Sequence, residues 1–233
     1  MCGRFVQAVK KEKVAERFDV KLPPEMALSD RYNLAPGQPA AVIVSGPAAR
    51  PMLDICVWGL VPSWAKDEHL GHKLFNARVE SLWEKPSFKD SLRYRRCLVP
   101  ANGFYEWRGP RQRGQRSPWY FTAKDQPLFT FAGLWAVWND RAGGTLHTFT
   151  IITRPANAFM SAYHHRMPSI LPAACEADWL DSRLYRPTDV QPLLDACSEP
   201  DLEARPVSAR INQIHYDAPD CIEPVPNDEL FPL

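Results

Sequence analysis

Proline is about twice as frequent as glycine in this chain, with 23 prolines against 11 glycines among 233 residues. Each proline fixes its own φ angle, lacks an amide donor and interrupts regular helices and central strands. Prolines spread along the chain therefore shorten the elements and set rigid corners between them. We expect a loop-rich fold in which extended structure outweighs helix.

Short runs of β-branched and aromatic residues predict strands, and amphipathic or proline-started segments predict helices. The expected strands are 2–6, 40–44, 52–60, 97–99, 104–107, 119–122, 128–138 and 148–153. The expected helices are about 8–18, 86–92, 155–163, 173–181 and 188–196. Residues 22–39 are rich in turn-forming residues, and 108–116 are expected to form an exposed hairpin loop whose arginines are solvated.

No repeat, low-complexity segment or linker divides the sequence, so we expect a single domain over residues 1–233. A formal net charge of +1 gives no global electrostatic argument for a nucleic-acid partner, so any such site must be a local patch. Six widely spaced cysteines show neither a disulfide pattern nor a zinc-binding spacing, and neither a metal site nor a cofactor is predicted. Without a signal-type or membrane-spanning apolar run, an intracellular soluble protein is expected, cytoplasmic if the host is bacterial.

Cys2 follows the initiator methionine, and removal of Met1 would leave a single residue with both an α-amine and a thiol. The amine can condense with an aldehyde to a Schiff base, and the thiolate can then close a five-membered thiazolidine ring. With ordinary pKa values of about 7.7–8.0 for the amine and about 8.5 for the thiol, both groups are partly nucleophilic near neutral pH. For most proteins that begin in this way, a buried cysteine without a chemical role is the simpler explanation.

Six short segments combine reactive or aromatic residues with rigid neighbours: MCGRF at 1–5, RYNLAPG at 31–37, WGLVPSW at 58–64, FNARVES at 75–81, NGFYEW at 102–107 and YHHRMP at 163–168. In this order and spacing they resemble the motifs of the SOS-response-associated peptidase family. The resemblance implies an α+β fold, a single domain with a curved, barrel-like and mostly antiparallel sheet flanked by short helices. It also implies a sensor of abasic sites in single-stranded DNA that forms a covalent crosslink through its terminal cysteine, with self-processing and crosslink reversal as associated activities.

The resemblance assigns catalytic roles to Cys2, Asn76, Glu106 and His164. An abasic deoxyribose is mostly a closed hemiacetal, so its capture needs proton transfer during ring opening and during loss of water. Glu106 lies among aromatic residues that would keep its carboxyl group able to shuttle protons, and an imidazole such as His164 titrates near neutral pH. Asn76 could hold the Cys2 amine or a sugar hydroxyl by hydrogen bonds. His165 departs from the acidic or amide residue expected after His164.

A DNA strand needs phosphate donors and a surface on which bases can stack. Arg4, Arg78 and Arg166 each lie within two residues of a catalytic candidate, so their guanidinium groups are expected to converge on the phosphates that flank the lesion. Trp64 is the expected stacking platform, and the resemblance adds Asn33, in the RYNLAPG segment, to the DNA-binding residues. Three other tryptophans lie in expected strands and are assigned to the core: Trp58, Trp135 and Trp138.

Three other functions remain open from the residues alone. An N-terminal-nucleophile hydrolase would use Cys2 to attack an amide, with its own amine or His164 as the base. A metalloprotein would use His69 and His72 together with His164 or His165, although spacing does not fix the remaining ligands. A reader of modified bases would bind DNA reversibly and tolerate the loss of Cys2.

Overall fold

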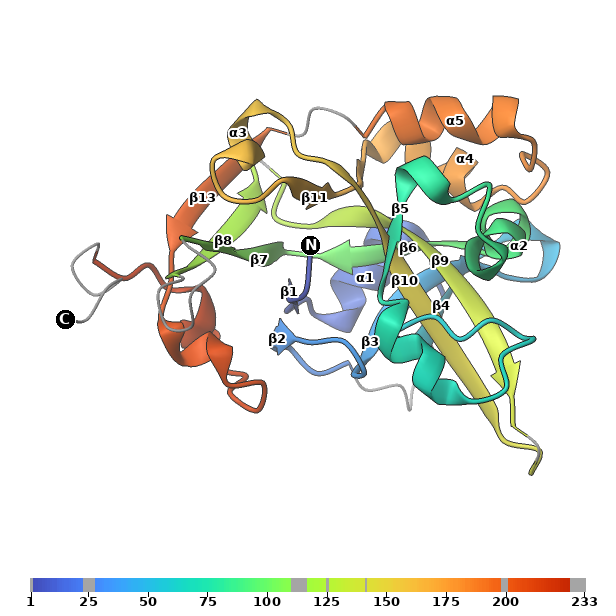
Figure 1. The fold of residues 1–233 in the computed structure, drawn as a ribbon, viewed down its shortest axis with the longest axis horizontal. Coiled ribbons are helices and arrows are strands. Elements are labelled where there is room, and N and C mark those ends of the chain that lie inside the picture. Colours follow the sequence, from blue (N-terminus) through green and yellow to red (C-terminus); the bar gives the residue numbers. More distant parts are fainter. Residues whose placement is uncertain are drawn as a thin grey trace.

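The computed structural model describes residues 2–22, 28–109, 117–124, 126–140, 142–197 and 201–226. Two sheets form most of the structure (Figure 1). The larger sheet contains, in spatial order, β11 (Arg166–Pro168), β10 (Thr145–Pro155), β4 (Pro51–Trp58), β3 (Pro39–Ser45), β6 (Arg96–Ala101), β9 (Phe129–Asn139) and β12 (Ile170–Leu171), with β5 (Asn76–Arg78) beside β10. The smaller sheet contains β13 (Leu202–Pro206), β8 (Ser117–Ala123), β7 (Gly103–Arg108), β1 (Phe5–Gln7) and β2 (Arg31–Leu34).

The larger sheet closes on itself because β9 also pairs with β10, from Asn139 opposite Thr145 to Gly133 opposite Ile151. Strands β10, β4, β3, β6 and β9 thereby form a closed five-stranded barrel. Among the strand pairs of the two sheets, those of β10 with β4 and with β5 are parallel and the others are antiparallel. The prediction of an α+β fold around a curved, barrel-like and mostly antiparallel sheet is confirmed.

Alternate residues of β3 face two different apolar clusters, as the pleat of a strand requires. Val42 belongs to the cluster inside the barrel, which also contains Phe5 and Trp58. Ile43 belongs to a second cluster, which packs the outside of the barrel against helix residues such as Phe88 and Leu193. The start of the chain therefore contributes to the barrel interior, whereas the helices cover its outer surface.

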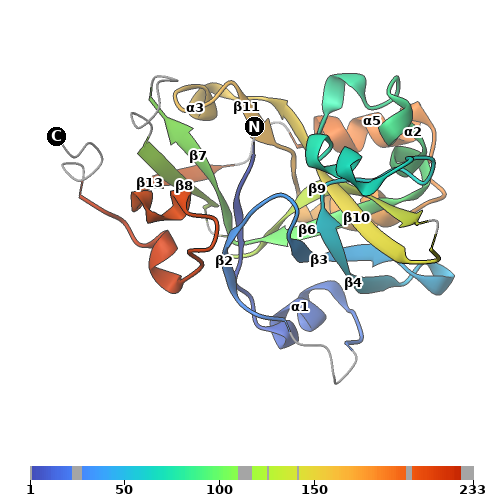
Figure 2. The same cartoon turned by 60° about the horizontal axis from the view of Figure 1, so that its bottom comes forward.

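In the described residues five short α-helices surround the sheets, and Figure 1 shows α2, α4 and α5 close together on one side of the barrel. Figure 2 shows α2 and α5 on the same side. None of the helices in the described residues is long and apolar enough to cross a membrane. The helices are α1 (Lys11–Phe18), α2 (Pro86–Tyr94), α3 (Ala158–Ser161), α4 (Glu176–Leu180) and α5 (Pro187–Asp195). The 3₁₀ turns are Pro47–Ala49, Glu68–Lys73, Val79–Ser81, Ala173–Cys175, Ala209–Asn212 and Pro219–Ile222.

Each expected strand and helix has a counterpart in the structure, with shifted ends. The largest difference is in the helix expected at 155–163, because β10 continues to Pro155 and α3 begins only after Asn157, whose side chain accepts a hydrogen bond from the Met160 amide. The sequence did not predict β2, β5, β11, β12 or β13, which are short or polar. Residues 110–116 of the expected arginine-rich loop lie outside the described residues.

Candidate active site

The pairing of β1 with β7 brings the start of the chain beside Glu106. Phe5 lies opposite Phe104 in this antiparallel pair, and the Tyr105 amide donates to the Arg4 carbonyl oxygen at 3.0 Å. The two strands run in opposite directions. When the register is followed past these residues, Cys2 and Glu106 lie one residue away from being directly opposite each other. Cys2 is fully buried and Glu106 is 3% exposed.

The thiol of Cys2 lies among apolar side chains next to a negative charge. Burial, and secondly the charge of Glu106, raises the pKa of this thiol far above its ordinary value. Its Sγ lies 3.9 Å from the Arg4 carbonyl oxygen. The thiol is therefore neutral at physiological pH, and it needs a proton acceptor or a nearby positive charge before it can react as a thiolate.

Asn76 holds the backbone of Cys2 in place. It lies opposite Ile151 in the parallel pair of β5 and β10, and its Nδ2 donates to the Cys2 carbonyl oxygen at 2.7 Å. Its Oδ1 is buried and has no hydrogen-bond partner among the described residues. Leaving a buried acceptor without a donor costs about 1–3 kcal/mol, so this oxygen is available to a donor on a substrate or on the processed chain end.

His164 lies on the loop between α3 and β11, and its Nδ1 is 3.8 Å from Oε1 of Glu106. The same Nδ1 is 3.0 Å from the Arg166 backbone nitrogen and 3.1 Å from the Arg166 carbonyl oxygen. A neutral ring can accept from this amide at Nδ1, whereas a protonated ring can donate from Nδ1 to the carbonyl oxygen or to Glu106. The backbone of this loop can therefore form a hydrogen bond with the His164 ring in either of its protonation states, which a residue that carries protons needs.

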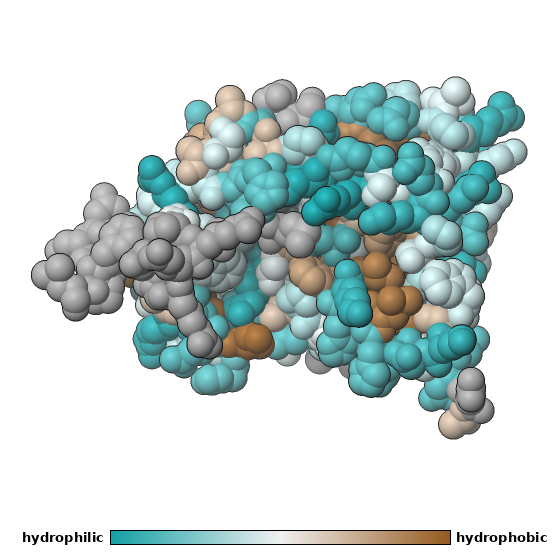
Figure 3. All heavy atoms as spheres, in the orientation of Figure 1, coloured by the Kyte–Doolittle hydropathy of each residue, from teal (hydrophilic) through white to brown (hydrophobic). Residues whose placement is uncertain are grey.

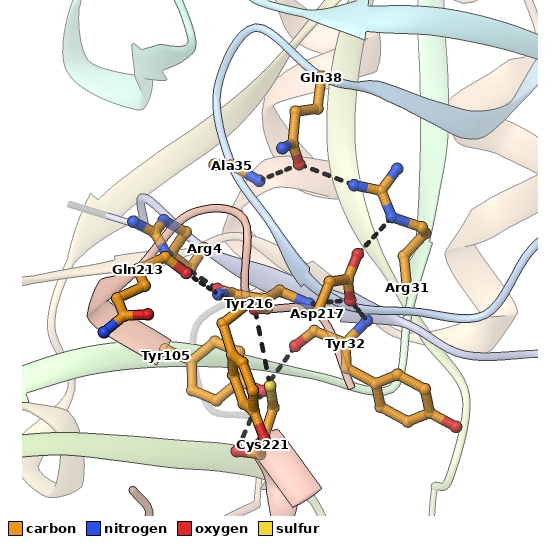
Figure 4. Close-up of polar contacts among 11 residues, drawn as sticks. Arg4, Arg31, Tyr32, Ala35, Gln38, Tyr105, Gln213, Tyr216, Asp217 and Cys221 are labelled. Atoms are coloured by element: carbon orange, nitrogen blue, oxygen red, sulfur yellow. Dashed lines mark hydrogen bonds and ion pairs between the residues drawn. The ribbon is translucent and has the colours of Figure 1, made fainter. Parts of the chain in front are cut away.

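Arg4 belongs to a polar network that ties β1 and β2 to the C-terminal part of the chain (Figure 4). Its Nη1 donates to Oδ1 of Asn33 at 2.8 Å and to the Ile211 carbonyl oxygen at 2.7 Å. Nδ2 of Asn33 donates to the carbonyl oxygens of Ile211, Gln213 and Tyr216. Partial burial lowers the pKa of the Arg4 guanidinium.

Asn33 is fully buried, so the structure does not bring it to a surface where it could touch DNA. The four hydrogen bonds of its side chain instead fix the position of Arg4 and of the chain around residues 211–216. We therefore treat Asn33 as a residue that positions Arg4. Arg4 itself is half-buried, and its guanidinium lies 5.9 Å from the centre of the Trp107 ring.

Replacing Asn33 with alanine should lower the free energy of unfolding by about 2–3 kcal/mol, because Arg4 and several buried carbonyl oxygens lose their partners. A urea titration measures this change. Asn139→Ala, at the exposed end of β9, is the control and should change stability by less than about 0.5 kcal/mol. Equal small effects of the two substitutions would show that the Asn33 network contributes nothing to stability.

The three arginines expected to grip phosphates occupy different environments. Arg166 is 7% exposed, and its guanidinium pairs with both carboxylate oxygens of Glu80 and donates to the Thr153 carbonyl oxygen at 2.6 Å. The hydrogen bonds from Arg166 hold the pKa of the Glu80 carboxyl below its usual value. Arg78 is exposed at the end of β5. Arg78 is thus the exposed residue of the three, whereas Arg166 is buried, Arg4 is half-buried, and the guanidinium groups of both are bound by protein groups.

Trp64 is 57% exposed, unlike the core tryptophans. It lines a surface cavity of about 510 Å³ together with Lys66, His69 and Lys73. The next residue, Ala65, is anchored because its carbonyl oxygen accepts from Nε1 of Trp138 at 2.9 Å. The molecular face in Figure 3 is mostly hydrophilic, with small apolar areas. Of the tryptophans assigned to the core, Trp58 and Trp138 are buried and Trp135 is partly buried.

A further aromatic pair, Trp119 and Tyr163, lies next to Glu106 and was not predicted from the sequence. Trp119 lies opposite Glu106 in the pair of β7 with β8, and its ring centre is 5.1 Å from that of Tyr163. The guanidinium of Arg108 lies 5.8 Å from the Trp119 ring and 5.5 Å from the Tyr163 ring. The position of Tyr163 directly before His164 was the available signal.

Two histidines of the alternative metalloprotein hypothesis, His69 and His72, lie near each other. The rings of His69 and His72 are 5.7 Å apart, in the 3₁₀ turn Glu68–Lys73. In the part of the chain that the structure describes, the one group of three or more potential metal ligands consists of Asp54, Cys56 and His147. Neither of these two histidines belongs to that group.

Comparisons with known proteins identify relatives that match most of this chain. A protein from Bacteroides thetaiotaomicron has a similar solved structure, with a TM-score of 0.85 and 26% identity over 96% of this chain and 100% of that chain. Abasic site processing protein YoqW of Bacillus subtilis (strain 168) is 39% identical over 224 residues, 96% of this chain and 99% of its own length. Abasic site processing protein HMCES of Gallus gallus is 32% identical over 228 residues, 83% of this chain and 66% of its own length. The model of the SOS response associated peptidase (SRAP) family matches residues 1–214, and the chain belongs to this family.

Proposed function

We propose that this chain captures abasic sites in single-stranded DNA by forming a thiazolidine crosslink through Cys2 after Met1 has been removed. The observation that carries the proposal is the set of groups around Cys2. Its carbonyl oxygen is bound by Asn76, the charge of Glu106 acts on its thiol, and His164 lies 3.8 Å from Glu106. Relatives named abasic site processing proteins support the same substrate.

The reaction follows from the chemistry of an aminothiol. The Cys2 amine adds to the C1′ aldehyde of the ring-opened deoxyribose and gives a carbinolamine, which loses water to form an imine. The sulfur then adds to the imine carbon, the thiol proton passes to the nitrogen, and the thiazolidine ring closes. One aldehyde and one aminothiol thus give one thiazolidine and one water. Glu106 and His164 move the protons in these steps, and in the reverse direction they would release the DNA.

Burial raises the pKa of the Cys2 thiol, which favours the amine as the first of the two nucleophiles. The amine reacts first, because a buried neutral thiol is a weak nucleophile. The protonated imine then places a positive charge next to the sulfur and favours the thiolate. Oδ1 of Asn76, which has no donor among the described residues, can accept a hydrogen bond from the amine or from a sugar hydroxyl.

A single strand suits this site better than a duplex. In a duplex the lesion is stacked between its neighbours, and extruding it costs a few kcal/mol, which an unpaired strand does not require. Exposed Arg78 would contact a phosphate, and exposed Trp64 would stack on a base. Arg166 would act from inside the protein by holding the His164 loop through its pair with Glu80.

The proposal is tested by mixing the protein with a single-stranded oligonucleotide that carries one abasic site. We expect a complex that survives a denaturing gel with the natural abasic site, and none with a tetrahydrofuran analogue, which has no aldehyde. Reversible binding of both oligonucleotides without a denaturation-resistant complex would contradict the proposal and favour a reader of DNA.

Replacing Arg78 with alanine should weaken binding of the tetrahydrofuran oligonucleotide and lower the slope of log K against log salt by about 0.7, the value for one phosphate contact on a single strand. Fluorescence anisotropy at several salt concentrations measures both quantities. Arg50→Ala, which removes an exposed arginine between β3 and β4, should leave the slope unchanged. The same slope for wild type and Arg78→Ala would remove Arg78 from the DNA interface.

The description of the family as a peptidase favours a second activity of the same site. The Cys2 thiol would attack the carbonyl carbon of residue 1, the Cys2 nitrogen would leave with a proton from His164, and water would hydrolyse the thioester. Intact-mass measurement of protein purified with Met1 still attached tests this activity. Time-dependent loss of one methionine without added peptidase supports self-processing, and a constant mass contradicts it.

A further inference from the structure

Three residues with side chains that commonly bind metals lie at the junction of β4 and β10, and none of them belongs to the proposed active site. The parallel pair of these strands places Thr148 opposite Val57. His147 and Cys56 directly precede those residues, so they lie side by side, and Asp54 is on the same face of β4 two positions earlier. Cys56 belongs to the buried cluster inside the barrel, whereas the side chains of Asp54 and His147 are 21% and 37% exposed.

The donor atoms of these three residues converge. The possible ligand atoms all lie within 4.8 Å of one another. Nδ1 of His147 is 2.6 Å from Oδ2 of Asp54, and Sγ of Cys56 is 3.8 Å from the same oxygen. The Ile55 amide donates a hydrogen bond to Oδ1 of Asp54 at 2.8 Å. The other carboxylate oxygen, Oδ2, is the one that lies near the His147 nitrogen and the Cys56 sulfur.

Thiolate, imidazole and carboxylate together are the donor set that suits Zn²⁺ and related divalent transition metals. Zinc–ligand bonds of about 2.0–2.3 Å put the donors of a tetrahedral site roughly 3.3–3.6 Å apart. The sulfur–oxygen separation of 3.8 Å is already close to this value, and the nitrogen–oxygen separation of 2.6 Å has to open slightly. Because the three residues lie on paired strands, binding of the ion would require only this small change in the distances between their donor atoms.

We propose that Asp54, Cys56 and His147 bind a Zn²⁺-class divalent ion, with water as the fourth ligand on the exposed side. Cys56 loses its proton to solvent on binding, His147 binds through Nδ1 with its own proton on Nε2, and Asp54 binds as a carboxylate. The two anionic ligands balance the charge of the ion, which suits a partly buried position. The ion would link β4 to β10 close to the short stretch in which the two strands pair. In that stretch Thr148 lies opposite Val57, and Phe149 lies opposite Trp58.

Cobalt(II) chloride titration of metal-free protein tests the site, because a thiolate ligand gives a charge-transfer band in the near ultraviolet and four-coordinate cobalt gives intense visible bands. We expect one equivalent of cobalt to produce both bands, and zinc sulfate to remove them by displacement. Cys56→Ser should lose the charge-transfer band. Asp54→Asn and His147→Gln change partly exposed side chains. Each should lower cobalt affinity by more than about 10–100-fold, which is the loss that removal of an outer-shell partner causes.

Cys197→Ser, which changes a buried cysteine in the cluster outside the barrel, is the matched control and should bind cobalt like the wild type. Zinc should also raise the Tm of wild type and control while leaving Cys56→Ser and His147→Gln unchanged. A charge-transfer band that persists in Cys56→Ser, or cobalt affinity that is unchanged in both Asp54→Asn and His147→Gln, would overturn the proposal. Crosslinking to abasic DNA should be the same in all these variants, so the metal proposal and the proposed function fail separately.

Discussion

Replacing Cys2 with serine should abolish the complex that survives a denaturing gel, while an imine with abasic DNA should still be trapped by reduction with cyanoborohydride. Serine after Met1 removal retains the α-amine and forms the imine, but its oxygen closes at best a weaker oxazolidine ring. We expect loss of essentially all stable crosslink in the absence of reductant. Gel electrophoresis of parallel reactions with and without cyanoborohydride measures both products.

Two variants show whether this loss is specific to Cys2. Cys221→Ser changes another buried cysteine, beside the network of Figure 4, and should crosslink like the wild type. A residue added ahead of Cys2, and shown by intact mass to be removed neither by cells nor by the protein itself, should abolish both products, because the amine becomes an amide. A stable crosslink formed by Cys2→Ser without reductant, or by the blocked chain, would be incompatible with an aminothiol mechanism.

Replacing Glu106 with glutamine should slow crosslinking by about 10²–10⁴-fold, the usual contribution of a positioned acid or base. Glutamine preserves the size of the buried side chain but cannot exchange a proton with His164 or with the reacting groups at Cys2. Affinity for the tetrahydrofuran oligonucleotide should stay within about twofold, because Glu106 contacts no phosphate in this mechanism. Single-turnover gel assays give the rate, and anisotropy gives the affinity.

Glu84→Gln neutralises an exposed glutamate and should change neither quantity. If Glu106→Gln lowers the crosslinking rate and the strand affinity by the same factor, the residue supports the structure of the site and does not act as an acid or base. An unchanged rate would remove Glu106 from the chemistry altogether.

The sequence predicted the elements that have strong local signals. β3, β9 and β10 carry runs of β-branched and aromatic residues, β6 contains the apolar run Cys-Leu-Val, and α2 begins with a proline at its first position. By contrast, β5 is the tripeptide Asn-Ala-Arg, and β13 reads Leu-Glu-Ala-Arg-Pro. These strands form because a neighbouring strand offers an edge, and a single sequence does not reveal that edge.

The positions of Cys2, Asn76 and Glu106 show how much of the candidate site could be predicted from the sequence. The motifs identified these residues, and the contact of Asn76 with the Cys2 carbonyl oxygen agrees with a role beside Cys2. The partners of the arginines were not accessible, because Glu80 lies 86 residues from Arg166 and was not assigned any role. Likewise, the burial of Asn33 depends on a C-terminal segment about 180 residues away.

The ligand group at β4 and β10 was missed for the same reason. Asp54 and His147 are 93 residues apart, so no local spacing of the kind found in zinc fingers marks them. Closure of the barrel brings β4 beside β10 and creates the group. Sites made by distant strands become visible only when the pairing of those strands is known.

The most direct test of the central claim is the intact mass of the protein after reaction with an abasic oligonucleotide. The account predicts one species whose mass equals the chain without Met1 plus the whole oligonucleotide minus one water. Tandem mass spectrometry should place the adduct on residue 2. An adduct on a chain that still carries Met1, or cleaved DNA with no adduct, would contradict the proposed capture by the Cys2 amine and thiol.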